Sequence, residues 1–256
     1  DELPSAELET NFDFGGVAGG RALLDGAATN ASAYFGAFIN AFVECGYTPG
    51  LNLHGAPYDW RLSPRDLHRG GYFARLKKLV ENSVIANGRP AALIGHSYGG
   101  PLIKYFLRQQ SSLWRDRFIL GFVPVGAPFG GSVGIIEAVA AGNTLGAPFL
   151  SPSLFWPVQS TAPSGAWLSP HPEVFDHADR PMLPIAITRE ANFSASNLSL
   201  FYEGIGHSEF LPMLEEVQRS HLDEILAPPL TRTTCIFGVD LPTVEAMDFR
   251  SAAPAQ

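Results

Sequence analysis

Short apolar runs divide this chain into segments typical of buried strands. The clearest runs cover residues 91–94 and 118–125, and residues 51–56, 182–187 and 233–239 also have the character of strands. A continuous apolar run of this length favours a strand that is buried on both faces of a sheet. We therefore predict five strands spread along the chain.

Between these runs, apolar residues recur at the spacing of a helix. We predict a helix over residues 31–45, capped by Asn30 and ended by Gly46, with apolar positions at Phe35, Phe38, Ile39 and Phe42. A second helical region begins after Ser63-Pro64 and closes near Gly88. Further helices follow residue 100 and cover residues 209–226.

Alternating strands and helices predict an α/β fold with a mostly parallel sheet covered by helices on both faces. The 256 residues fit one domain over residues 1–256. Residues 142–184 interrupt the alternation, because they are rich in proline and aromatic residues and lack regular periodicity. We interpret this segment as an inserted cap or lid, and the alternative is a pair of short helices.

The composition is that of a globular protein and excludes some classes of function. The net charge is −8 and no basic run exists, which argues against nucleic-acid binding. No apolar stretch reaches the roughly 18 residues that a membrane span needs. The acidic start, without a signal peptide or a starting methionine, suggests a fragment or processed form. Cys45 and Cys235 are expected to be buried free thiols.

Three N-glycosylation sequons begin at Asn30, Asn192 and Asn197. They permit glycosylation of a protein that enters the secretory pathway, although chance alone gives about one such motif in a chain with this asparagine content. The sequence therefore gives weak support to a glycoprotein in an extracellular, lysosomal, vacuolar or endoplasmic-reticulum compartment.

The motif with the clearest chemistry is Gly95-His96-Ser97-Tyr98-Gly99. It matches the G-x-S-x-G nucleophile elbow, in which a serine lies on a strained turn between a strand and a helix. The glycines remove Cβ atoms that would clash where the strand and the helix crowd together. We predict Ser97 as a nucleophile and expect His96 to be a packed side chain rather than the catalytic base.

Four sequence blocks resemble the lecithin–cholesterol acyltransferase family, which also includes phospholipid:diacylglycerol acyltransferases and lysosomal phospholipases. Besides the elbow they are APYDWRL at residues 56–62, WRDRFI with GAPFGGS at residues 114–132, and CIFGV with LPT at residues 235–243. Their order along the chain is the family's order. The resemblance implies an α/β-hydrolase fold and acyl transfer through a serine acyl-enzyme.

The resemblance also implies two oxyanion donors. One is the N–H of Tyr98, directly after the nucleophile. The other lies in a PGFG-type turn, which matches Asp13-Phe14-Gly15-Gly16 loosely because the proline is missing; Phe14 or Gly15 would donate. The family's membrane-binding segment near the N-terminus is not recognisable in this chain.

The catalytic acid and base of the family follow the last block, and neither is recognisable before Gln256. We expect them outside this chain, which alone would then be almost inactive. The alternative is an internal triad in the required order Ser, Asp, His, built from Asp176 or Asp179 with His207 or His221.

From this resemblance we predict an O-acyltransferase that moves a fatty acyl group from a glycerophospholipid to a sterol, diacylglycerol or other alcohol, on a membrane or lipoprotein surface. The alternatives are a phospholipase A or lipase that uses water, and a non-catalytic module that binds lipid or protein. Trp156 and Trp167 are candidates for acyl-chain contacts or for core anchors. We expect no cofactor, and no metal because the histidines lack ligand spacing.

Overall fold

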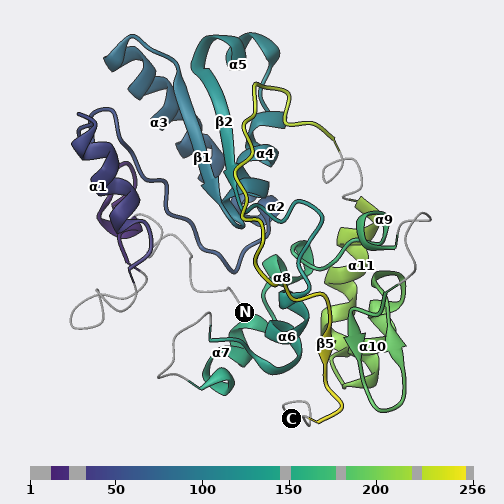
Figure 1. Ribbon diagram of the computed structural model, residues 1–256. Coiled ribbons are helices and arrows are strands. Elements are labelled where there is room, and N and C mark those ends of the chain that lie inside the picture. The colour runs from purple at the N-terminus through teal and green to yellow at the C-terminus, as the bar shows by residue number, and fades with distance from the viewer. Residues whose placement is uncertain (1–12, 23–32, 145–150, 177–182, 221–226, 252–256) are drawn as a thin grey trace. The chain divides into compact units, whose positions relative to one another are not determined.

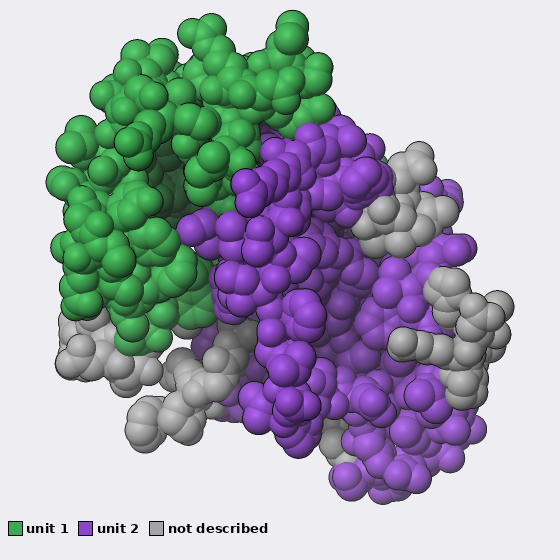
Figure 2. Space-filling model, turned by 45° about the horizontal axis from the view of Figure 1, so that its top comes forward, with its two compact units in different colours: residues 1–60, 64–93, 110–121 green, residues 61–63, 94–109, 122–256 purple. Residues whose placement is uncertain are grey.

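The computed structural model describes residues 13–22, 33–144, 151–176, 183–220 and 227–251. The chain forms two compact units, coloured separately in Figure 2. The first comprises residues 1–60, 64–93 and 110–121, and the second comprises residues 61–63, 94–109 and 122–256. Among the described residues, no helix is both long and apolar enough to cross a bilayer.

Helices dominate the first unit. They are α1 (Gly36–Glu44), α2 (Pro64–Arg69), α3 (Tyr72–Asn87) and α5 (Ser112–Phe118), with a short 3₁₀ turn at Ala18–Gly20. Helix α3 ends where the sequence predicts, because Gly88 adopts a left-handed φ of 65° and donates its N–H to the carbonyl of Val84. The indole N–H of Trp114 on α5 donates to the Glu81 carboxylate on α3 at 2.7 Å.

Helix α1 is shorter than the predicted helix over residues 31–45. Ala33 pairs with Ala22 in an isolated antiparallel bridge, and the N–H of Tyr34 donates to the carbonyl of Arg21 at 2.9 Å. These non-helical bonds delay the helix until Gly36, while the predicted cap, Asn30, lies outside the described residues. Ile39 is the buried residue of this helix.

The predicted strand over residues 51–56 is wrong. The carbonyl of Thr48 accepts hydrogen bonds from the N–H groups of Leu51, Asn52 and Leu53 at 3.1, 3.1 and 3.2 Å. This turn uses the donors that a strand would offer to a neighbour. Gly55 has backbone partners further away in sequence, since its N–H donates to the carbonyl of Gly16 and its carbonyl accepts from the N–H of Gly15.

Strands β1 (Ala91–His96) and β2 (Ile119–Val125) form a two-stranded sheet. The N–H of Ser97, directly after β1, donates to the carbonyl of Val125 at the end of β2 at 2.9 Å. The two strands therefore end side by side and run parallel, as the sequence predicts.

The predicted strand over residues 233–239 lies beside β2 without forming a regular ladder. Thr233 and Ile236 form isolated parallel bridges to Phe122 and Val125. Pro124 lies between those two residues of β2 and has no N–H to donate, which interrupts the ladder. Figure 1 shows this yellow segment passing β2 and continuing to β5 (Met247–Asp248).

The second unit contains most of the remaining elements. A small sheet has the order β4-β3-β5, in which β3 (Ala186–Ile187) is antiparallel to β4 (Asn192–Phe193) and parallel to β5. Strand β3 is all that forms within the predicted strand over residues 182–187, whose first residue lies outside the described part. The helices are α4 (Gly99–Arg108), α6 (Gly134–Ala141), α7 (Pro152–Gln159), α8 (Pro163–Trp167), α9 (Pro172–Phe175), α10 (Leu198–Gly204) and α11 (Leu211–Ser220), with 3₁₀ turns at Ala195–Asn197 and Ser208–Phe210.

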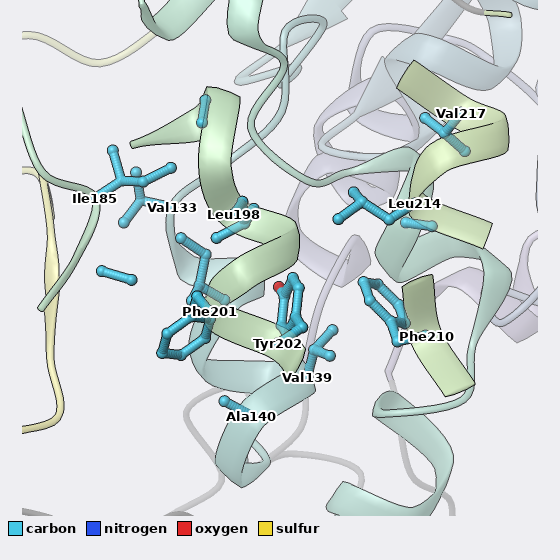
Figure 3. Close-up of a cluster of buried hydrophobic side chains, with 14 residues drawn as sticks. Val133, Val139, Ala140, Ile185, Leu198, Phe201, Tyr202, Phe210, Leu214 and Val217 are labelled. Atoms are coloured by element: carbon cyan, nitrogen blue, oxygen red, sulfur yellow. The ribbon is translucent and has the colours of Figure 1, made fainter. Parts of the chain in front are cut away.

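A cluster of buried apolar side chains forms the core of the second unit (Figure 3). Phe201, Tyr202 and Phe210 lie at its centre, with ring centroids 5.3 Å apart for Phe201 and Tyr202 and 4.9 Å apart for Tyr202 and Phe210. Helix α6 contributes Ile136 and Val139, both fully buried. The helical pattern predicted over residues 209–226 corresponds to α11 within its described part.

Helices α7, α8 and α9 occupy the described part of the predicted insertion over residues 142–184. Short helices, as the alternative proposes, are therefore present in the described part of this segment. Each begins with a proline in its first turn, which explains why proline-rich sequence hides helices here. Whether this segment acts as a lid stays a prediction.

Both cysteines are exposed and free, so the expectation of buried thiols is wrong. Cys45 directly follows α1. Cys235 belongs to the segment beside β2, in which Ile236, Phe237 and Val239 are also exposed.

Candidate active site

Ser97 lies at a sharp turn between β1 and α4. Its φ of 50° is in the left-handed region, where side chains other than glycine are strained. Gly95 shows why the turn is so tight, because a Cβ atom there would lie 2.5 Å from the carbonyl oxygen of Gly99. The local geometry is that of a nucleophile elbow, with a half-exposed serine at its apex.

The loop after β2 packs directly against the elbow. A Cβ atom on Gly100 would lie 2.3 Å from the Cβ of Ala127, so glycine lets helix and loop approach. Gly126 has a φ of 52° and donates its N–H to the carbonyl of Ile236 at 2.8 Å. Backbone contacts thus fix the surroundings of Ser97 on the side of β2.

Tyr98 is the N-cap residue of α4 and is 7% exposed. Its carbonyl accepts from the N–H of Leu102 at 3.2 Å, and its hydroxyl donates to the carbonyl of Leu62 at 2.8 Å. The N–H groups of a first helical turn have no acceptor within the helix, and the helix dipole favours negative charge there. An oxyanion formed at Ser97 would lie at this end of α4.

Phe14 and Gly15 belong to the first unit. The N–H of Gly15 donates to the carbonyl of Gly55 at 2.9 Å, and Gly15 has a φ of 96°. A Cβ atom on Gly55 would lie 2.6 Å from the carbonyl oxygen of Gly16, so this approach requires glycine. Gly15 thus uses its N–H within the first unit, and the role of either residue as an oxyanion donor stays a prediction.

The internal triad of Asp176 and His207 does not form. The Asp176 carboxylate accepts from Ser194 Oγ at 3.1 Å and from the N–H groups of Ala195 and Ser196 at 3.3 and 2.6 Å. His207 is buried, and its Nδ1 lies 3.4 Å from the Glu209 carboxylate. The other candidates, Asp179 and His221, lie outside the described residues.

Both candidate tryptophans pack inside the second unit. Trp167 is 7% exposed and meets Tyr105 edge-on at 6.2 Å. Trp156 is half-buried, donates its indole N–H to the carbonyl of Val139 at 3.1 Å and lies 5.3 Å from the ring of His207. Contact of either ring with an acyl chain stays a prediction.

The structure reveals attachments of the predicted insertion that sequence reasoning missed. The N–H of Ser132 donates to the carbonyl of Leu168 at 2.9 Å, and the N–H of His171 donates to the carbonyl of Gly130 at 3.0 Å. A Cβ atom on Gly131 would lie 2.3 Å from the carbonyl oxygen of Ser169. The Gly-Gly pair was a signal of such a close approach, although not of the partner.

Candidate metal ligands are considered in the described part of the chain. Within it, no three His, Cys, Asp or Glu side chains come together in a way that would hold a metal ion. His171 uses its Nδ1 to accept from the N–H of Glu173 at 3.3 Å and so caps α9. The expectation of a cofactor-free enzyme stays a prediction.

A serine on a strained turn, between a strand of a parallel sheet and a helix, defines the α/β-hydrolase class of protein. The family model described as "Lecithin:cholesterol acyltransferase" matches residues 21–227, and the chain belongs to this family. The predicted resemblance is therefore confirmed.

Individual relatives support the same family. The chain is 32% identical over 220 residues to "Lysosomal phospholipase A and acyltransferase" of Rattus norvegicus, covering 86% of this chain and 51% of the relative. It is 34% identical over 234 residues to "Lecithin-cholesterol acyltransferase-like 1" of Arabidopsis thaliana, covering 86% and 52%. For "Phosphatidylcholine-sterol acyltransferase" of Mus musculus the identity is 32% over 214 residues, covering 83% and 47%. The chain thus spans about half the length of these curated relatives.

Proposed function

We propose that the whole protein transfers a fatty acyl group from a glycerophospholipid to a hydroxyl acceptor through an acyl-enzyme on Ser97. The observation that carries this proposal is the left-handed φ of 50° at Ser97, at the elbow of a chain that belongs to an acyltransferase family. A strained, half-exposed serine at this turn suits a nucleophile and has no evident structural use.

In the first step, Ser97 Oγ attacks the ester carbonyl of the lipid, and a base takes the hydroxyl proton. The carbonyl oxygen becomes negative and accepts hydrogen bonds from preorganised N–H groups. We assign one donor to Tyr98 and the second to Phe14, because Gly15 donates to Gly55. Collapse of the tetrahedral intermediate expels the lysophospholipid alcohol, which receives the proton.

We place the base and its orienting acid in parts of the whole protein outside these 256 residues. This placement rests on the partners of the internal candidates, since Asp176 accepts hydrogen bonds from residues 194–196 and His207 faces Glu209. A histidine from elsewhere would act as general base and an aspartate would orient it, as in other serine hydrolases.

In the second step, an acceptor hydroxyl attacks the acyl-enzyme and releases Ser97. When water is the acceptor, the same enzyme is a phospholipase A. The relative from Rattus norvegicus has both activities in its name, which favours keeping hydrolysis as a second candidate function. The chemistry of Ser97 is common to both outcomes.

The experiment uses the protein expressed from its complete reading frame and phosphatidylcholine vesicles with a long-chain alcohol. Acyl transfer predicts an alcohol ester, and hydrolysis predicts only free fatty acid. Ser97→Ala should abolish both products while the protein stays folded. A Ser97→Ala variant that retains either activity would refute the proposal, and a folded wild type without activity would favour the lipid- or protein-binding module.

We further propose a transient lipid surface as partner and a compartment of the secretory pathway. One relative has the word "lysosomal" in its name. Asn192 of the second sequon is exposed on the edge strand β4. Asn197 of the third sequon instead accepts from the N–H of Ser194 at 2.6 Å in a capping box. Expression in a secretory host should therefore yield a glycan that Asn192→Gln removes.

A further inference from the structure

Two buried tyrosines bind the ends of the block at residues 56–62. In the first unit, the hydroxyl of Tyr72 donates to the carbonyl of Ala56 at 2.9 Å. In the second unit, the hydroxyl of Tyr98 donates to the carbonyl of Leu62 at 2.8 Å. The exposed fractions of Tyr72 and Tyr98 are 5% and 7%, so the two contacts are chemically equivalent.

Their positions relative to the elbow differ. Tyr98 directly follows Ser97, and its backbone starts α4, where Leu102 donates to its carbonyl. Its ring extends from the elbow to Leu62, so the residue is fixed at the backbone and again at the hydroxyl. Tyr72 lies at the start of α3, in the unit that does not contain Ser97, and Tyr72→Phe keeps the ring that packs edge-on against Phe14 at 6.0 Å.

The segment whose Leu62 carbonyl accepts the hydrogen bond from Tyr98 is itself held by other contacts. The carbonyl of Arg61 accepts from the N–H of Ser164, at the start of α8, at 3.0 Å. Ser164 is 4% exposed and its helix continues into the fully buried Ala166. The hydrogen bond from α8 to Arg61 therefore holds the neighbouring Leu62 carbonyl in place as an acceptor.

We propose that the Tyr98 hydroxyl is a positioning group for the acyl-transfer reaction. By binding the Leu62 carbonyl, it holds the peptide between Ser97 and Tyr98 so that the N–H of Tyr98 points at the oxyanion. The inference rests on the proposed function, because it requires Ser97 as nucleophile and the Tyr98 N–H as oxyanion donor.

Oxyanion stabilisation demands accurate placement, since useful donors lie about 2.7–3.1 Å from the developing charge. Complete removal of one donor lowers kcat by about 10²–10³-fold, and a misplacement of about 1 Å costs up to about 10²-fold. Loss of the Tyr98 hydroxyl leaves the donor present but less constrained. We expect kcat to fall by about 10-fold, while KM stays unchanged because the ester binds before the charge develops.

The test compares Tyr98→Phe with Tyr72→Phe in the protein from the complete reading frame. Each change removes one buried hydroxyl that donates to a backbone carbonyl, so their effects on stability are matched. A soluble short-chain ester gives kcat and KM. A trifluoromethyl ketone, which forms a tetrahedral oxyanion on the serine, reports on donor placement without turnover.

Tyr98→Phe should lower kcat by about 10-fold and weaken binding of the trifluoromethyl ketone by a similar factor, with KM within about twofold. Tyr72→Phe should leave all three quantities within about twofold of the wild type. Equal losses in the two variants, or a change in KM alone, would overturn the positioning role. Ser97→Ala tests the proposed function separately, because a fully active Ser97→Ala enzyme refutes that function whatever Tyr98→Phe does.

Thermal unfolding of both variants establishes that the comparison concerns folded protein. Should Tyr98→Phe not accumulate, Tyr98→His is the second variant, since its ring is shorter and does not reach the Leu62 carbonyl. A lowered kcat with weakened ketone binding supports the role, and wild-type values for both contradict it.

Discussion

Ser97 has a backbone conformation that an ordinary side chain disfavours. In the left-handed region, Cβ approaches the backbone carbonyl closely, which costs roughly 1–2 kcal/mol for an L-residue. Ser97 adopts this conformation with a φ of 50°, whereas its neighbour Tyr98 has helical dihedrals. The chain accepts this strain at the one position where a side-chain oxygen must project from the end of β1.

This strain predicts that Ser97→Gly is more stable than Ser97→Ala. Glycine adopts positive φ without a clash, although it gains entropy in the unfolded state, so we expect a net difference of about 1 kcal/mol in the free energy of unfolding. Urea unfolding of the two variants measures it. Equal stabilities, or a more stable alanine variant, would mean that the turn is relaxed.

Asp176 has a structural role that its sequence context did not reveal. Its carboxylate accepts from Ser194 and from two N–H groups at the start of the 3₁₀ turn Ala195–Asn197. Because bonds to charged groups contribute about 1.5–3 kcal/mol each, Asp176→Ala should destabilise the chain by about 2 kcal/mol or more. Asp116→Ala, at an exposed position of α5, is the control and should change stability by less than about 0.5 kcal/mol.

The same variant tests the alternative of an internal triad. If Asp176 is structural, the folded Asp176→Ala protein should keep its kcat below its melting temperature. A loss of about 10⁴-fold, as expected for the acid of a triad, would restore the internal triad.

At the scale of elements, the sequence predicted those whose pattern is strong and local. Helix α3 has both a periodic apolar face and Gly88 at its end, and β1 has a continuous apolar run followed by the elbow glycine. The strand predicted over residues 51–56 failed because the carbonyl of Thr48 competes for its N–H groups. The strand predicted over residues 233–239 forms only isolated bridges, because Pro124 interrupts the ladder from the partner strand β2. Nothing in the sequence of residues 233–239 indicates this interruption.

Helix α9 is capped by a titratable side chain, His171. Burial lowers the pKa of His171 below 6.5, although the carbonyl of Gln218 and the charge of Glu173 oppose this shift. Below about pH 6.5 the unfolded chain therefore takes up a proton that the folded protein resists, so the free energy of unfolding falls as the pH falls. Protonation at Nδ1 would also remove the acceptor for the N–H of Glu173.

We predict that His171→Asn reduces this acid sensitivity. Asparagine keeps an acceptor suited to the cap and does not titrate. Urea unfolding at about pH 7.5 and about pH 5 should show a smaller loss of stability for His171→Asn than for the wild type. The same loss in both proteins would assign the pH dependence to other groups.

For the whole molecule, the class and family were predictable because they reside in contiguous blocks. The elbow and the blocks at residues 56–62, 114–132 and 235–243 are legible one by one, and the family match over residues 21–227 confirms what they indicate. The hydrogen bonds of Tyr98 with Leu62 and of Asp176 with Ser194 were not predictable. Each joins residues far apart in sequence, so its existence depends on how the chain folds.

The central claim is that Ser97 forms the acyl-enzyme, and covalent labelling tests it most directly. The protein from the complete reading frame is treated with a fluorophosphonate, digested and analysed by mass spectrometry. We predict one phosphonylated peptide, modified at Ser97, and no labelling of Ser97→Ala or of wild type that has been unfolded beforehand. Modification of a different serine, or undiminished labelling of folded Ser97→Ala, would contradict the account.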